Sequence, residues 1–172
     1  SEGCKIEAVT GKGYCLMADS DVITKQGIEK YLGRQAERFD IRVYRTITST
    51  NTVLKELAAN GAMEGTVLIS AEQTAGKGRM NRRFHSPSGT GLYLSVLLRP
   101  SMKAEDALFI TTAAAVAVAR TAEEVSGRQT GIKWVNDVYL DGKKICGILT
   151  EASLDIESGG LEYAVCGIGV NI

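Results

Sequence analysis

The residues whose types and spacing best suit chemistry lie in one basic segment, residues 73–84. The segment reads Gln-Thr-Ala-Gly-Lys-Gly-Arg-Met-Asn-Arg-Arg-Phe and lies between two apolar runs, residues 66–71 and 91–99. Glycine lets backbone N–H groups approach an anion closely, and arginine adds bidentate, charge-assisted hydrogen bonds. The segment therefore suits the binding of phosphate or carboxylate, although a solvated basic loop has the same composition. It is not a P-loop, because the pattern Gly-x-x-x-x-Gly-Lys-Ser/Thr is absent.

Further polar residues interrupt apolar runs later in the chain. Lys133 and the pair Asn136-Asp137 lie within residues 132–140, and Lys144 begins the run 144–151. Asparagine and aspartate oxygens suit Mg²⁺, which takes carboxylate together with phosphate, but the pair is equally typical of a turn or a helix cap. No Ser-His-Asp or Cys-His arrangement is evident. The chemistry that fits is phosphate-centred, with cations and N–H groups stabilising charge on a transferring nucleotidyl group.

Alternating strand and helix patterns must position these residues. Ser49-Thr50-Asn51 precedes an amphipathic helix that stops at Asn60-Gly61, and plain helix capping explains the polar triplet on sequence alone. A hairpin is expected over residues 4–16, strands over 41–47, 66–72 and 91–99, helices over 23–38 and 104–126, and a three-stranded antiparallel meander over 132–140, 144–151 and 161–172. The fold class is α+β: a mixed, largely antiparallel sheet with helices packed on one face.

Length, charge balance and cysteine content indicate which classes of protein the chain can belong to. The 172 residues suit one ordinary domain with a small appendage, and 20 basic residues balance 20 acidic ones, so no global field attracts nucleic acid or membrane. The four cysteines have no C-x-x-C spacing, and together with the single His85 they do not form a typical set of zinc ligands. The cysteines are therefore interpreted as reduced residues of a cytoplasmic protein. No apolar run is long enough to span a membrane.

Taken together, the motifs resemble those of one family. Ser49-Thr50-Asn51, residues 73–84, Ser95 and the segments 133–137, 144–151 and 167–171 resemble biotin protein ligases in order and spacing, over roughly residues 41–172. The resemblance implies a class II synthetase-like catalytic core over residues 19–172. Residues 3–16 resemble the wing of the winged helix in bifunctional ligases that also repress transcription, so residues 1–18 are expected to be a remnant winged-helix hairpin. We expect the 172 residues to lack the helix-turn-helix that precedes the wing in that family and the small C-terminal barrel that follows the core.

The resemblance also implies an activity. Biotin and ATP would react to biotinyl-5′-AMP and pyrophosphate, and a lysine of a biotin carboxyl carrier domain would then take the biotin. Mg²⁺ is the implied metal, and a homodimer through a sheet edge is the default form of self-association. Three alternatives stay open: a biotin-sensing repressor fragment, which would bind DNA only with the missing helix-turn-helix, a lipoate ligase of the same fold, and an inactive fragment that still binds biotin.

Roles carry over from the family by position. The biotin-binding residues implied are Ser49, Thr50, Asn51, Gln73, Gly76, Arg79, Lys144, Gly147 and Gly167, of which Arg79 and Lys144 are also the catalytic candidates. The implied ATP and phosphate contacts are Lys77, Arg79, Arg82, Phe84, Lys133, Asn136, Gly169 and Asn171, with Asp137 and Asn136 on the Mg²⁺. 

The chain departs from the family pattern at four positions. Lys77 stands where the family loop has its first arginine, Asn81 where it has its third glycine, Phe84 where it has tryptophan, and Val135 where it has proline. Lysine in place of arginine loses a bidentate fork. Because the acyl-adenylate is sensitive to water, residues 76–84 are expected to be mobile without ligand and to order over it.

Overall fold

The computed structural model describes residues 6–11, 13–16, 22–155, 157 and 159–172, and divides into two compact units, residues 1–36 and 37–172. In the first unit, β1 (Ile6–Val9) and β2 (Gly13–Leu16) form the expected antiparallel hairpin. Helix α1 (Lys25–Leu32) follows, capped by Thr24, whose Oγ1 accepts a hydrogen bond from Gly27 N at 3.1 Å. A 3₁₀ turn, η1 (Gly33–Arg38), leads on toward the second unit. The domain boundary expected after residue 18 lies outside the described residues.

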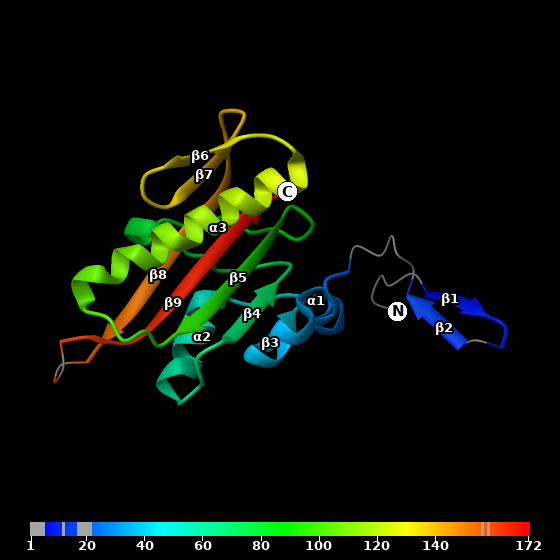
Figure 1. Ribbon diagram of the computed structural model, residues 1–172, viewed down its shortest axis with the longest axis horizontal. Coiled ribbons are helices and arrows are strands. Elements are labelled where there is room, and N and C mark those ends of the chain that lie inside the picture. Colours follow the sequence, from blue (N-terminus) through cyan, green and yellow to red (C-terminus); the bar gives the residue numbers. More distant parts are fainter. Residues whose placement is uncertain (1–5, 12, 17–21, 156, 158) are drawn as a thin grey trace. The chain divides into compact units, whose positions relative to one another are not determined.

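The second unit is built on a seven-stranded sheet with the strand order β3-β4-β5-β9-β8-β7-β6 (Figure 1). The strands are β3 (Asp40–Tyr44), β4 (Thr66–Ser70), β5 (Gly91–Leu98), β6 (Thr130–Lys133), β7 (Asp137–Leu140), β8 (Lys143–Leu154) and β9 (Leu161–Asn171). Only the β3–β4 pair is parallel, because α2 (Thr50–Ala59) carries the chain across between them. The expected mixed, largely antiparallel α+β class is confirmed.

The predicted three-stranded meander is wrong in one detail, since the sheet has four strands there. The chain turns at residues 134–136, so the single run 132–140 becomes the hairpin β6–β7. Trp134 is 73% exposed in this turn, and Lys133 is exposed at the end of β6. The polar pair Asn136-Asp137 therefore marks the end of a turn, although the apolar residues on either side suggested one continuous strand.

The expectation that helices pack on one face of the sheet is also wrong. On β9, Val165 packs with Leu54 and Ala58 of α2, whereas its neighbour Cys166 packs with the helix α3 (Leu108–Ser126). Successive strand residues point to opposite faces, so α2 and α3 cover opposite faces. Figure 1 shows α3 lying along β8 and β9. Both faces of the central strands are apolar, and both need a helical cover.

Helix ends follow the predicted signals. Ser49 is the N-cap of α2, and Asn60 and Gly61 end it. A 3₁₀ turn, η3 (Ala104–Ala107), precedes α3, which ends at Gly127 in the left-handed conformation with φ of 68°. Among the described residues, no helix combines the length and apolar character needed to cross a bilayer.

Candidate ligand-binding cavity

A cavity opens on the α2 face of the sheet, where β5, β9 and β8 extend beyond the helix. Its walls come from the N-terminal turn of α2, from strands β5, β8 and β9, and from the basic loop between β4 and β5, which contains the 3₁₀ turn η2 (Arg79–Asn81). The lining residues are Ser49, Thr50, Asn51, Gln73, Lys77, Gly78, Arg79, Phe84, Leu94, Asn136, Lys144, Gly147, Ile148, Leu149, Gly167, Ile168 and Gly169. Segments separated by more than a hundred residues thus meet at one site.

The floor of the cavity consists of glycines on two adjacent strands. Gly147 of β8 is the register partner of Gly169 of β9, and Gly167 lies two residues earlier on the same face. A Cβ at Gly169 would lie 2.6 Å from Phe84 Cε1, and a Cβ at Gly167 would overlap the amide of Asn51. These glycines make room for two side chains of the protein itself.

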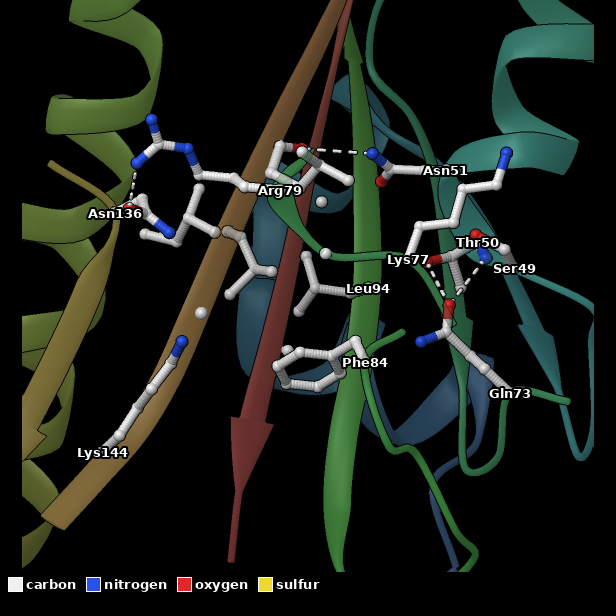
Figure 2. A pocket seen from close by; sticks show the side chains of 17 residues that line it. Ser49, Thr50, Asn51, Gln73, Lys77, Arg79, Phe84, Leu94, Asn136 and Lys144 are labelled. Carbon is white, nitrogen blue, oxygen red and sulfur yellow. Dashed lines mark hydrogen bonds between the residues drawn. The ribbon is translucent and has the colours of Figure 1, made fainter. Parts of the chain in front are cut away.

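One end of the cavity presents uncharged hydrogen-bonding groups. Ser49 Oγ caps α2 by accepting from Thr52 N at 3.4 Å, which confirms the capping interpretation for that residue. Thr50 N donates to Gln73 Oε1 at 2.8 Å (Figure 2). Gln73 Nε2 donates to Ser86 Oγ at 3.0 Å. The helix N-terminus and the loop residue Gln73 therefore hold each other in place.

The opposite end is cationic. Lys144 Nζ lies 2.7 Å from Asp137 Oδ1, and Arg79 Nη1 donates to Asn136 Oδ1 at 2.7 Å. Asn136 Nδ2 in turn donates to Asp137 Oδ1 at 2.8 Å. Within the described part of the chain, Lys77 forms no ion pair. Lys144 and Arg79 are therefore two cations beside the single carboxylate of Asp137, and this end has an excess of positive charge that suits an anion, whereas Lys77 lies beside Thr50 (Figure 2).

Phe84 lies between the two ends (Figure 2). Its ring stands edge-on to Tyr93, with 6.3 Å between centroids and an interplanar angle of 78°. The loop that carries it is closed by Gly78 N donating to Arg82 O at 2.7 Å and Phe84 N donating to Gly76 O at 2.9 Å. The loop thus folds back on itself and lays an aromatic ring on the glycine floor.

Twelve of the predicted site residues line the cavity, and five do not. Gly76 is buried inside the loop, where a Cβ would lie 2.6 Å from Ser86 Oγ. Arg82 and Lys133 are exposed outside the lining. Asn171 Nδ2 donates to Lys144 O at 3.4 Å, and Asp137 contacts the lining residues Lys144 and Asn136 without lining the cavity itself.

Sequence reasoning missed several lining residues and most of the buried hydrogen bonds. Gly78, Leu94, Ile148, Leu149 and Ile168 also line the cavity. Strand alternation from the predicted Gly147 is the signal that would find Leu149, but it places Ile148 on the opposite face of the sheet. Ser86, Lys55 and Glu151 had no assigned role, yet all three hydrogen-bond within the network behind the cavity. Among the described residues, no three His, Cys, Asp or Glu side chains gather as a metal site.

Comparisons with known proteins agree with this geometry. A sequence model of the biotin/lipoate A/B protein ligase family matches residues 43–171. The bifunctional ligase/repressor BirA of Bacillus subtilis is 39% identical over 171 residues, which are 99% of this chain and 52% of that protein. The biotin–[acetyl-CoA-carboxylase] ligase of Mycobacterium tuberculosis is 35% identical over 129 residues, which are 72% of this chain and 46% of that protein.

Among solved structures, a biotin protein ligase from Aquifex aeolicus in complex with biotin and ATP superposes with a TM-score of 0.62 and 30% identity. That superposition covers 77% of this chain and 52% of the other. The chain spans about half the length of the curated relatives it matches. With a family model matched over most of its length, the chain belongs to the biotin/lipoate A/B protein ligase family.

Proposed function

We propose that this chain carries the catalytic site of an ATP-dependent biotin protein ligase. The observation that supports this most directly is the two-ended cavity, in which uncharged groups of Thr50 and Gln73 lie opposite the cations Lys144 and Arg79. Biotin has the same division, with an uncharged cyclic urea at one end and a carboxylate at the other. The related Aquifex structure contains biotin and ATP together, which supports the same two substrates here.

The first reaction would join two anions. An oxygen of the biotin carboxylate attacks the α-phosphorus of ATP, the new O–P bond forms, and the bond to pyrophosphate breaks. Lys144 and Arg79 lie where they would reduce the repulsion between the carboxylate and the phosphate, and such preorganised charge is a large part of catalysis in transfers of this kind. Lys144 Nζ lies 2.7 Å from Asp137 Oδ1, so the incoming anion would either share the Lys144 ammonium group with Asp137 or displace Asp137 from it.

The second reaction would transfer the biotinyl group. A neutral lysine amine of an acceptor protein attacks the acyl carbon, AMP leaves with the electron pair of the C–O bond, and the nitrogen loses a proton. The name of the Mycobacterium relative supports a carboxylase carrier domain as the acceptor. Burial of the acyl-adenylate under the loop at Phe84 would exclude water from the anhydride.

The nucleotide side of the site and its metal are parts of the same proposal. Lys77, Arg82, Lys133, Asn136, Gly169 and Asn171 would contact the nucleotide, with Phe84 packing against it. Asp137 offers one carboxylate beside Asn136, which fits Mg²⁺ because this ion is commonly held by one or two carboxylates together with substrate phosphates. Bound there, the ion would neutralise phosphate charge.

The first unit and the setting of the protein are inferred from the same relatives. The Bacillus ligase/repressor matches 99% of the chain, which supports residues 1–18 as part of a winged helix and DNA binding by a longer protein. Self-association as a homodimer and a cytoplasmic location belong to this proposal as well. Cys146 and Cys166 are free and buried, in keeping with a reducing compartment.

The test is biotin-dependent exchange of labelled pyrophosphate into ATP. Lys144→Ala should lower the exchange rate by roughly a hundredfold or more, since a charge in direct contact with the reacting groups is lost. Lys143→Ala is the matched control, because Lys143 is exposed, lies outside the cavity lining, and should leave the rate unchanged. Exchange that depends on lipoate instead of biotin would assign the chain to the lipoate branch of the family. Absence of both exchange and biotin binding by calorimetry would overturn the proposal.

A further inference from the structure

The basic loop between β4 and β5 is tied together at its base by one buried hydroxyl, that of Ser86. Ser86 is 3% exposed, and its Oγ accepts a hydrogen bond from Gln73 Nε2 at 3.0 Å. The same oxygen donates to Phe84 O at 3.1 Å. Backbone contacts close the loop around this hydroxyl, because Gln73 N donates to Ser86 O at 2.9 Å and Phe84 N donates to Gly76 O at 2.9 Å. One side chain therefore joins the first residue of the segment 73–84 to its last.

The direction of each hydrogen bond in this chain is fixed by the groups at its two ends. Thr50 N can only donate, so the oxygen of the Gln73 amide must face it, at 2.8 Å. The Gln73 nitrogen then faces Ser86, whose oxygen accepts from it. Phe84 O can only accept, so the single hydroxyl proton of Ser86 goes to it. Donation therefore runs in one direction, from the N-terminal turn of α2 through Gln73 and Ser86 to the backbone of Phe84.

The surroundings of Ser86 leave room for this hydroxyl. A Cβ at Gly76 would lie 2.6 Å from Ser86 Oγ and 2.5 Å from Phe84 O, so a glycine is needed beside the two oxygens. On the other side of Ser86, the hydroxyl of Tyr93 donates to Pro87 O at 3.2 Å. Tyr93 therefore anchors the chain after Ser86, and the Ser86 hydroxyl anchors the chain before it.

The position of Phe84 bears directly on the cavity. Its ring fills the space above two glycines, since a Cβ at Gly169 would lie 2.6 Å from Phe84 Cε1 and a Cβ at Gly147 would lie 3.1 Å from Phe84 Cε2. The ring lies between the uncharged end and the cationic end (Figure 2). Ser86 itself does not line the cavity. An effect of Ser86 on a bound ligand must therefore pass through Phe84 or Gln73.

We propose that Ser86 is a positioning residue that, by tying Phe84 to Gln73, holds the aromatic ring over the acyl-adenylate and keeps water from it. The inference rests on the proposed function, because the acyl-adenylate is the intermediate of that function. In the side reaction that is prevented, a water oxygen attacks the acyl carbon and loses a proton, and AMP leaves with the electron pair of the C–O bond. The products are biotin and AMP, so each such event wastes one ATP. Loops that close over reactive intermediates exclude water in this way.

Removing the hydroxyl should shorten the lifetime of the bound acyl-adenylate without slowing its formation. Ser86→Ala deletes two hydrogen bonds that hold the loop, so the intermediate should be lost roughly tenfold faster, which is the effect of about one net hydrogen bond. Pyrophosphate exchange should stay within about threefold of wild type, because the cations Lys144 and Arg79 are untouched. Ser86→Cys nearly keeps the side-chain volume but has only a weak S–H donor, so the lifetime should fall in this variant as well.

Two comparisons separate this role from a structural one. Ser88→Ala is the matched control, since Ser88 is exposed two residues further along the same loop and should leave the lifetime unchanged. Phe84→Ala removes the ring itself and should shorten the lifetime at least as much as Ser86→Ala. Because Ser86 acts through Phe84, the double variant Ser86→Ala/Phe84→Ala should be no worse than Phe84→Ala alone, whereas independent losses of packing would add.

The measurement is a single-turnover assay in which the enzyme is loaded with biotin and with ATP labelled at the α-phosphate, freed of unbound nucleotide, and followed without acceptor. Loss of bound adenylate and appearance of free AMP are recorded, pyrophosphate exchange is measured in parallel, and thermal unfolding confirms that each variant is folded. The expected result is a lifetime about tenfold shorter in Ser86→Ala, shorter in Ser86→Cys and unchanged in Ser88→Ala.

Three outcomes would overturn the inference: an unchanged lifetime in both Ser86 variants, equal losses of lifetime and of exchange, or additive effects in the double variant. Failure of wild type to form the adenylate would instead overturn the proposed function on which the inference rests.

Discussion

Replacing Gly167 by alanine should destabilise the protein strongly, because the glycine makes room for a buried side chain. A Cβ at this position would overlap Asn51 Oδ1 and lie 2.8 Å from Asn51 Cγ and 3.0 Å from Nδ2. Asn51 is 4% exposed and held on three sides by Leu149, Glu151 and Ser95. It cannot move aside without breaking these hydrogen bonds.

The cost follows from these contacts. Inserting a methyl group into a packed interior costs about 1–3 kcal/mol, and loss of the hydrogen bond between Asn51 and the charged Glu151 costs about 1.5–3 kcal/mol. The lower chain entropy of alanine in a strand returns about 0.5–1 kcal/mol. The unfolding free energy should therefore fall by about 3 kcal/mol, and the unfolding midpoint by about 6–12 °C for a chain of this size.

Gly147→Ala is the matched control, since Gly147 faces the same cavity from the adjacent strand. The nearest atoms to its added Cβ are Phe84 Cε2 at 3.1 Å and the flexible end of Lys144 at 3.3 Å, which can shift at a cost within about 1 kcal/mol. The assay is thermal and urea unfolding of both variants followed by circular dichroism. Equal midpoints for the two variants would refute the idea that Asn51 is locked against Gly167.

Three further predictions concern pH, thiol reactivity and the basic loop. The pKa of the Glu151 carboxyl is lowered in the folded protein, so its contribution to stability is complete above the usual pKa of 4.5 and is lost as the pH falls. The difference in unfolding free energy between wild type and Glu151→Gln should therefore shrink below pH 4.5. A difference that widens there would contradict the hydrogen-bonded carboxylate. Burial raises the pKa of Cys146 to about 12, so iodoacetamide at pH 8 should label its peptide only in denaturant, and native labelling at the rate of an exposed thiol would contradict its burial. Biotin with ATP should protect residues 76–84 from trypsin, and equal cleavage with and without ligands would count against loop closure.

Much of the fold follows from local signals in the sequence. Strand alternation and glycine turns located most strands of the sheet, and Asn60-Gly61 and Gly127 ended two helices where expected. The faces of the sheet were harder, because apolar alternation shows that a strand is buried but not which helix covers it. On β9, Val165 and Cys166 are both buried, and only the folded chain shows that they meet different helices.

The sequence predicted the cavity residues that belong to family motifs. It did not predict the hydrogen bonds between residues that are far apart in the chain. Thr50, Gln73, Arg79 and Lys144 stand out because the motifs around them are short and contiguous. Glu151 lies 100 residues from Asn51, and no local pattern reports their contact. A carboxylate within a long strand is equally typical of a solvent-facing position. Only the folded structure, in which β8 lies beside the first turn of α2, shows that Glu151 contacts Asn51.

Asn51 shows how a correct local explanation can be incomplete. Helix capping accounts for Ser49, whose side chain accepts from Thr52 N, and the same account predicts nothing further for the residues after it. Yet Asn51, in the first turn of that helix, turns both amide hydrogens toward β8, and its oxygen takes the space left by Gly167. The triplet therefore combines a cap with a side chain that, like Lys55 of the same helix, binds Glu151 of β8. A substitution that preserves the cap and changes the amide, such as Asn51→Leu, should leave helix content intact by circular dichroism while biotin affinity falls, and a loss of helix content would show that the cap explains the whole triplet.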